Sequence, residues 1–110
     1  MEAQAIACVD PVQGCVFTHR GMPAQLRFSR HPTPMQPFSV ELRVSGVMHA
    51  SAEVQMVGMD MGFNRYDLQT TGPGIFVAHI TLPVCVSGRR DWKFYLDVDS
   101  DRYVIPFNSQ

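Results

Sequence analysis

Residues 38–44 have the sequence Phe-Ser-Val-Glu-Leu-Arg-Val, in which apolar and polar side chains alternate at every position. Successive side chains of a β-strand point to opposite faces of its sheet, so this alternation predicts a strand with one buried and one solvated face. The same alternation recurs at residues 51–56, 76–82 and 92–98. Four such strands predict an all-β fold in which each sheet buries one face.

Three weaker runs extend the pattern, at residues 24–30, 63–70 and 102–107. Turn-forming residues separate the runs, at positions 31–34, 45–46, 72–74, 87–88 and 99–101. About seven short strands, with turns every 8 to 12 residues or so, predict an antiparallel, immunoglobulin-like β-sandwich.

The composition is that of one compact domain, with 110 residues of which 45% are hydrophobic and 17% charged. We expect residues 1–22 to form an N-terminal loop segment with two cysteines and residues 23–107 to form the sandwich core. The net charge of −1 gives no sign of the positive surface that binds nucleic acid, so we expect no nucleic-acid partner. No apolar run approaches the roughly 20 residues that a membrane-spanning helix needs, so we expect no membrane span in this chain.

Catalytic motifs are missing from the sequence. There is no glycine-rich phosphate loop, no Gly-x-Ser-x-Gly elbow and no carboxylate pair with the spacing of acid/base catalysts. The run Asp97-Val98-Asp99-Ser100-Asp101 resembles the start of a calcium loop but lacks its glycine and glutamate, so it predicts a strand end and a turn. We expect a protein that is not an enzyme.

Three cysteines, Cys8, Cys15 and Cys85, allow one internal disulfide and leave one thiol over. A bridge from Cys8 to Cys15 would close a short N-terminal loop. A bridge from Cys15 to Cys85 would close a long loop and stabilise by about 4 kcal/mol in the chain-entropy model, and we favour a bridge to Cys85. Three reduced cysteines in a cytosolic protein are the alternative.

The stretch Gly58-Met59-Asp60-Met61-Gly62 places two thioether sulfurs two residues apart between glycines. Thioethers favour Cu(I) over hard ions and persist in oxidising compartments. In an extended segment, the spacing lets both sulfurs project to one side. Met59 and Met61 are therefore candidate copper ligands, although methionines in a turn also serve as gap fillers. Met56 shares the face of the preceding strand's apolar residues and is best interpreted as core.

A third ligand is needed because two thioethers hold copper weakly, and an imidazole suits Cu(I). His79 is the first choice. It alternates with the apolar residues of its run and should project from the opposite sheet face, alongside Val77 and Thr81. It is otherwise an ordinary surface histidine, and His49 is a second possibility.

Cys15, His19 and Met22 have a Cys-x3-His-x2-Met spacing that is similar to the ligand loop of blue-copper proteins. Those sites need another histidine upstream of the cysteine, and here no histidine precedes Cys15. We therefore interpret His19 and Met22 as loop residues, with an auxiliary copper site as a further possibility.

Two long motifs carry a resemblance to a known family: Gly58-Met59-Asp60-Met61-Gly62-Phe63-Asn64-Arg65, and Leu82-Pro83-Val84-Cys85-Val86-Ser87-Gly88-Arg89 followed by Asp91-Trp92. Together with the early cysteines, they make residues 8 to 107 resemble small bacterial extracytoplasmic proteins related to the YtkA-like and FixH-like domains. The resemblance implies a role in copper homeostasis or in assembly of copper-containing respiratory oxidases. It also implies a periplasmic location and a CopC-like sandwich.

The candidate ligands and the resemblance together predict a monomeric or weakly associating periplasmic protein that binds Cu(I). We expect it to pass the metal to a copper-transfer or oxidase-assembly partner, or to sense it. The alternative is a metal-free interaction module. Arg89 and Arg90, just before Trp92, are candidate docking residues because Arg and Trp are enriched at interface hot spots. The preferred interpretation of these arginines is a charged turn that leads into a core strand whose first inward residue is Trp92.

Overall fold

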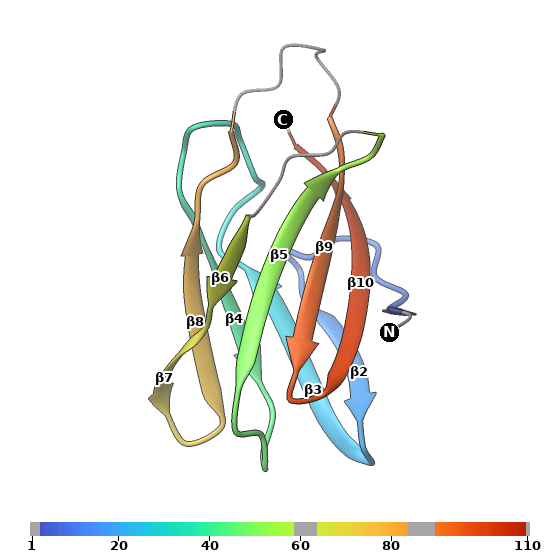
Figure 1. Cartoon of the computed structure of the whole chain (residues 1–110), viewed down its shortest axis with the longest axis vertical. Helices are drawn as coiled ribbons and strands as arrows, with labels where there is room; N and C mark the ends of the chain where they lie inside the picture. Colours follow the sequence, from blue (N-terminus) through green and yellow to red (C-terminus); the bar gives the residue numbers. More distant parts are fainter. Residues whose placement is uncertain (1–2, 59–63, 84–89, 110) are drawn as a thin grey trace.

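The computed structural model describes residues 3–58, 64–83 and 90–109, which form ten strands and no helix (Figure 1). Accordingly, this part of the chain contains no helix long and apolar enough to cross a membrane. The strands are β1 (Gln4–Ala5), β2 (Cys15–His19), β3 (Met22–Phe28), β4 (Phe38–Arg43), β5 (Ala50–Met56), β6 (Arg65–Asp67), β7 (Gln69–Gly72), β8 (Ile75–Ile80), β9 (Asp91–Val98) and β10 (Asp101–Asn108).

The strands form two five-stranded sheets that lie face to face (Figure 1). Sheet 1 has the order β1-β10-β9-β5-β6, and sheet 2 has the order β2-β3-β4-β8-β7. Neighbouring strands are antiparallel except β1 and β10, which pair in parallel. The predicted all-β, antiparallel sandwich is confirmed with ten strands in the described ranges instead of about seven, while the immunoglobulin-like topology stays a prediction.

Two predicted segments differ from the structure. The expected N-terminal loop contains β2, whose residues Cys15 to His19 pair with β3 across a tight hairpin. The single run expected at 63–70 is two strands, because the chain leaves sheet 1 after β6 and enters sheet 2 at β7. Leu68 lies at this crossing, buried, and its N–H donates to the Ala50 carbonyl of β5.

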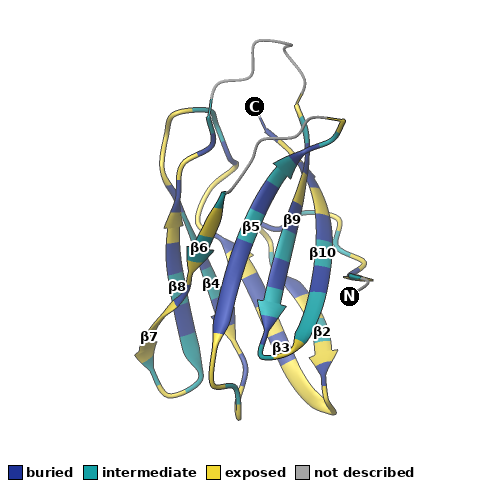
Figure 2. Cartoon of the chain, in the orientation of Figure 1, coloured by how far each residue is buried: buried dark blue, intermediate teal, exposed yellow. Residues whose placement is uncertain are grey.

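The core lies between the inner faces of the two sheets, where the alternating apolar residues meet (Figure 2). Phe28 of sheet 2 packs against Phe94 and Phe107 of sheet 1, with ring centroids 5.2 and 5.5 Å apart. Trp92 stacks on Phe107 and its indole N–H donates to Ser109 Oγ at 3.0 Å. Aromatic contacts therefore join the layers, and the buried indole nitrogen has its hydrogen bond.

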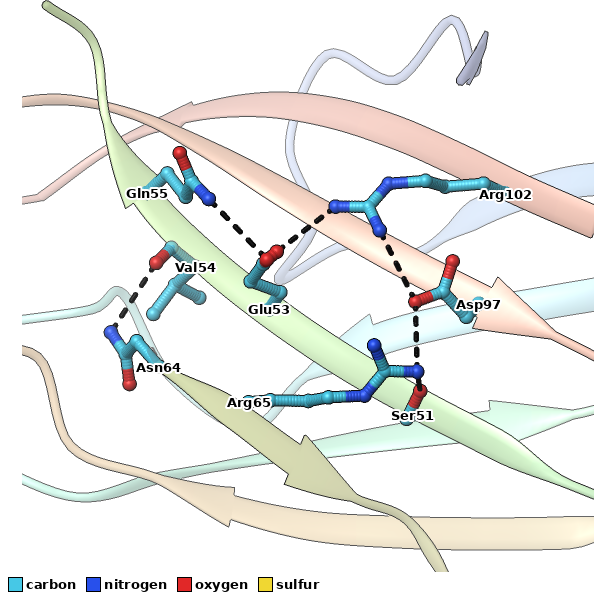
Figure 3. A network of polar contacts seen from close by, with 8 residues as sticks. All are labelled: Ser51, Glu53, Val54, Gln55, Asn64, Arg65, Asp97 and Arg102. Atoms are coloured by element: carbon cyan, nitrogen blue, oxygen red, sulfur yellow. Dashed lines mark hydrogen bonds and ion pairs between the residues drawn. The ribbon is translucent and has the colours of Figure 1, made fainter. Parts of the chain in front are cut away.

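The outer face of sheet 1 carries a connected polar network (Figure 3). Arg102 of β10 contacts Glu53 at 3.1 Å and Asp97 at 3.4 Å, and so joins β5, β9 and β10. Arg65 of β6 contacts the same Asp97 oxygen at 3.3 Å and donates to Ser51 Oγ at 2.8 Å. The charges of this network are thus mutually compensated across four strands.

Candidate functional site

Met59 and Met61, the first candidate ligands, lie outside the described residues, and the strand that follows them along the chain is β6. Asn64 pairs with Val54 of β5, because its carbonyl accepts from the Val54 N–H and its side-chain amide donates to the Val54 carbonyl at 3.3 Å (Figure 3). Two residues later, the Tyr66 hydroxyl donates to the Thr81 carbonyl at 3.3 Å. This contact ties β6 to the end of the strand that carries His79.

His79 projects outward from β8 and is exposed, as predicted, between outward-facing Val77 and Thr81. Its register partner on β4 is Ser39, and Ser39 Oγ lies 3.0 Å from His79 Nδ1. The structure gives the His79 ring no other polar contact within the described part of the chain. When Nδ1–H donates to the serine, Nε2 carries a free lone pair that faces solvent, which is the form that binds a metal.

Met56 is 2% exposed and lies in the core at the end of β5, as its core interpretation predicts. Met56 is a less favoured candidate copper ligand, and its burial among apolar side chains argues against that role. The thioether there fills space between the sheets.

His49 is exposed in the loop before β5 and does not share a site with His79. Its N–H donates to Asp99 Oδ1 at 2.9 Å, and the Met48 N–H donates to the same oxygen at 3.0 Å. This loop lies at the end of the sandwich where β5 begins, whereas β8 runs toward the opposite end (Figure 1). The two histidines are therefore candidates for separate sites.

The predicted loop position of His19 and Met22 is wrong, since they face each other across the β2–β3 hairpin. His19 is 3% exposed, and its Nδ1 lies 2.7 Å from the Tyr103 hydroxyl and 3.6 Å from an Asp101 oxygen. Burial, with Asp101 nearby, raises the pKa of Tyr103, so its hydroxyl stays protonated. The contact of His19 with Tyr103 links sheet 2 to sheet 1. Met22, across the hairpin, is exposed.

The disulfide joins Cys8 to Cys15, with their Cα atoms 5.3 Å apart. The favoured bridge to Cys85 is therefore wrong; Cys85 itself lies outside the described residues. The same bond removes the thiolate that a blue-copper arrangement of Cys15, His19 and Met22 would need.

A local turn explains the short bridge. The Asp10 carbonyl accepts from the N–H groups of Gln13 and Gly14, and its carboxylate accepts from the Val12 N–H at 3.0 Å. Gly14 has φ of +111°, and a Cβ there would lie 3.3 Å from the Gln25 amide. The Asp-Pro and Gly positions within the run Cys-Val-Asp-Pro-Val-Gln-Gly-Cys are the sequence signal for this turn.

Of the candidate docking pair, Arg90 is described and exposed, while Arg89 lies outside the described residues. The Arg90 carbonyl accepts from the Ser109 N–H at 2.9 Å. Trp92 is 1% exposed, so the interpretation of this region as an entry into a core strand is confirmed for Trp92.

Within residues 3–58, 64–83 and 90–109, no three His, Cys, Asp or Glu side chains lie together in a way that could hold a metal ion. Sequence reasoning missed Ser39 as a partner of His79, because the contact depends on the register between β4 and β8.

Comparison with protein-family models, curated proteins and solved structures finds no significant match to this chain.

Proposed function

We propose that this protein binds Cu(I) through Met59, Met61 and His79. The observation that carries the proposal is the hydrogen bond from Tyr66 to Thr81, which fixes the strand after the methionine segment beside the strand of His79. Met61 is three residues before Asn64 in the sequence, and a chain of that length spans at most about 11 Å. His79 offers an exposed imidazole whose other nitrogen is held by Ser39.

The chemistry of these donors suits copper handling. Two neutral thioethers and one imidazole bind soft Cu(I) and exchange one at a time with the ligands of an acceptor. The metal can then pass to a partner without release as a free ion. Together with the resemblance to YtkA-like and FixH-like proteins, this supports a role in copper homeostasis or respiratory oxidase assembly.

The proposed location is the bacterial periplasm or another extracytoplasmic compartment. The Cys8–Cys15 bond supports it, because structural disulfides persist in oxidising compartments and are rare in the cytosol. Thioether ligands fit the same setting, since they do not need a reduced thiolate.

The test is an anaerobic Cu(I) titration against a competing chelator, with the wild type and the double variant Met59→Leu, Met61→Leu. Leucine conserves volume and removes sulfur, so the variant should fold normally and lose at least about tenfold in affinity. The matched control is Met35→Leu, Met48→Leu, which removes two exposed thioethers that are not candidate ligands. Equal affinity in the wild type and the Met59/Met61 variant would overturn the proposal, as would loss in the control alone.

The rival proposal is a metal-free interaction module that docks through Arg89 and Arg90. Exposure of Arg90 supports it. Charge reversal at both arginines should then weaken partner capture and leave copper affinity unchanged. Full capture by the charge-reversed protein would count against this docking site.

A further inference from the structure

The outer face of sheet 2 differs from that of sheet 1 in its charge balance. We call it the arginine face, defined by the outward residues Arg27, Ser39, Glu41, Arg43, Val77 and His79. On this face Arg43 binds Glu41, with both Nε and Nη2 at 3.0 Å from one carboxylate oxygen. Arg27 lies directly across from Glu41 on β3, and within the described ranges its guanidinium has no polar partner.

The arginine face therefore carries two guanidinium groups and one carboxylate, and that carboxylate binds Arg43. On sheet 1, by contrast, Arg65 and Arg102 are both engaged by carboxylates in the network of Figure 3. A guanidinium has five N–H donors in a fork that matches a carboxylate, so a second carboxylate from outside would complete the set on sheet 2.

The surface is hollowed around the unpaired guanidinium. One hollow of about 290 Å³ is lined by Gln25, Arg27, Glu41 and Arg43. A second, of about 300 Å³, is lined by Arg27, Phe28, Ser29, Ser39, Glu41 and Val77. Arg27 and Glu41 line both hollows, so the two hollows adjoin at this pair. The second hollow reaches Ser39, the hydrogen-bond partner of His79.

The spacing of the two arginines favours an extended ligand. Arg27 pairs with Glu41 and Gln25 pairs with Arg43, so Arg27 and Arg43 are diagonal neighbours across β3 and β4. Diagonal neighbours lie about 7 to 8 Å apart. Side chains at alternate positions of an extended peptide lie about 6.6 to 6.8 Å apart on one side. Two carboxylates in such a peptide would therefore meet the two guanidinium groups.

We infer that the arginine face docks an extended acidic segment of a partner protein, with carboxylates at alternate positions. The docked segment lies across the two hollows, beside Ser39, and so passes close to His79. The partner that exchanges copper with this protein would therefore carry an exposed acidic segment. In identifying the partner as a copper-exchange protein, the inference rests on the proposed function. Carboxylate contacts on Arg27 and Arg43 would orient this partner before any ligand exchange.

The experiment is an NMR titration of metal-free, isotope-labelled protein with acetyl-Ser-Asp-Ser-Asp-Ser-Asp-Ser-amide. It is run at low ionic strength because salt screens exposed charges. We expect saturable amide shifts confined to β3, β4 and β8. A peptide of the same composition with its three aspartates adjacent should bind more weakly. The metal-free protein separates this result from the copper titration, so either proposal can fail alone.

The deciding variant is Arg27→Glu, which should weaken peptide binding about tenfold. Its matched control is Lys93→Glu, because Lys93 is an exposed cation on the outer face of sheet 1 and its reversal changes the net charge equally. Unchanged amide spectra away from the substitutions check that both variants fold. Equal weakening by both variants, shifts on both sheets, equal affinity for the two peptides, or no saturation would each overturn the inference.

Discussion

At the scale of single residues, the proposed copper site depends on the contact between Ser39 and His79. A histidine that binds metal through one nitrogen usually donates its other N–H to a fixed acceptor, which sets the tautomer and the ring orientation. Here the Ser39 hydroxyl lies 3.0 Å from His79 Nδ1 and accepts from it when Nδ1 carries the proton. Ser39 is itself anchored, since its N–H donates to Ser29 Oγ at 2.8 Å and its carbonyl accepts from the Ser29 N–H at 2.9 Å.

Replacement Ser39→Ala should weaken Cu(I) binding by about tenfold, because the His79 ring loses its orienting hydrogen bond. The nitrogen shifts of the His79 ring, measured by NMR without copper, should also move toward the tautomer mixture of a free imidazole. Ser45→Ala is the control, because Ser45 is an exposed serine in a turn. Unchanged affinity together with unchanged ring shifts would show that Ser39 does not position the ligand.

The sequence could predict the face of His79 but not its partner. Alternation along a single strand assigns each side chain to a face, and this was sufficient for His79 and for buried Met56. The Ser39 contact needs the pairing of β4 with β8, which alternation leaves open. The cysteine pair was missed for another reason. Loop entropy favours the long bridge, whereas the turn at Asp10 brings Cys8 and Cys15 together.

At the scale of elements, runs that alternate cleanly were predicted best. β4, β5, β8 and β9 lie within one or two residues of their expected bounds. β2 was missed because it is short and its inward positions include His19, which is buried only with a hydrogen-bond partner. The run containing β6 and β7 was predicted as one strand, because Tyr66 and Leu68 keep the alternation while the chain changes sheets.

The β9–β10 turn is joined to the loop before β5 by Asp99, which has φ of +52°. The N–H groups of His49 and Met48 donate to its carboxylate, and the His49 hydrogen bond is the main reason why the pKa of Asp99 is lowered. A lowered folded-state pKa means that this group stabilises the fold above its unfolded pKa of about 3.9. That stabilisation is lost as the pH falls through the folded-state pKa.

We therefore expect Asp99→Asn to be less stable than the wild type at pH 7, and the difference to shrink below about pH 4. Asparagine tolerates the positive φ and still accepts a hydrogen bond, so the loss comes mainly from the charge. Urea unfolding of both proteins between pH 7 and below about pH 4 measures this difference in the free energy of unfolding. The control is Asp67→Asn on β6, an exposed carboxylate without a hydrogen bond in the described residues. A stability difference for Asp99→Asn that does not vary with pH would contradict the assignment.

At the scale of the whole molecule, the two sheets depend on each other because they share one core. Phe28 contacts aromatic residues of the opposite sheet, and His19 reaches from β2 to Tyr103 of β10. The chain itself passes between the sheets at Leu68. Neither sheet could bury its apolar face alone, so we expect residues 3–58, 64–83 and 90–109 to unfold as one cooperative unit.

Replacement Leu68→Ala tests this cooperation at the crossing point. Leu68 is 7% exposed, and its truncation should lower the free energy of unfolding by about 2 to 4 kcal/mol. Two probes report on different sheets: fluorescence of Trp92, the single tryptophan, for sheet 1, and the amide NMR signal of Ala78 for sheet 2. Both midpoints in urea should shift together, whereas Val16→Ala on the exposed edge strand should change stability by no more than about 0.5 kcal/mol. Separation of the two midpoints would mean that the sheets unfold independently and that the crossing at Leu68 does not couple them.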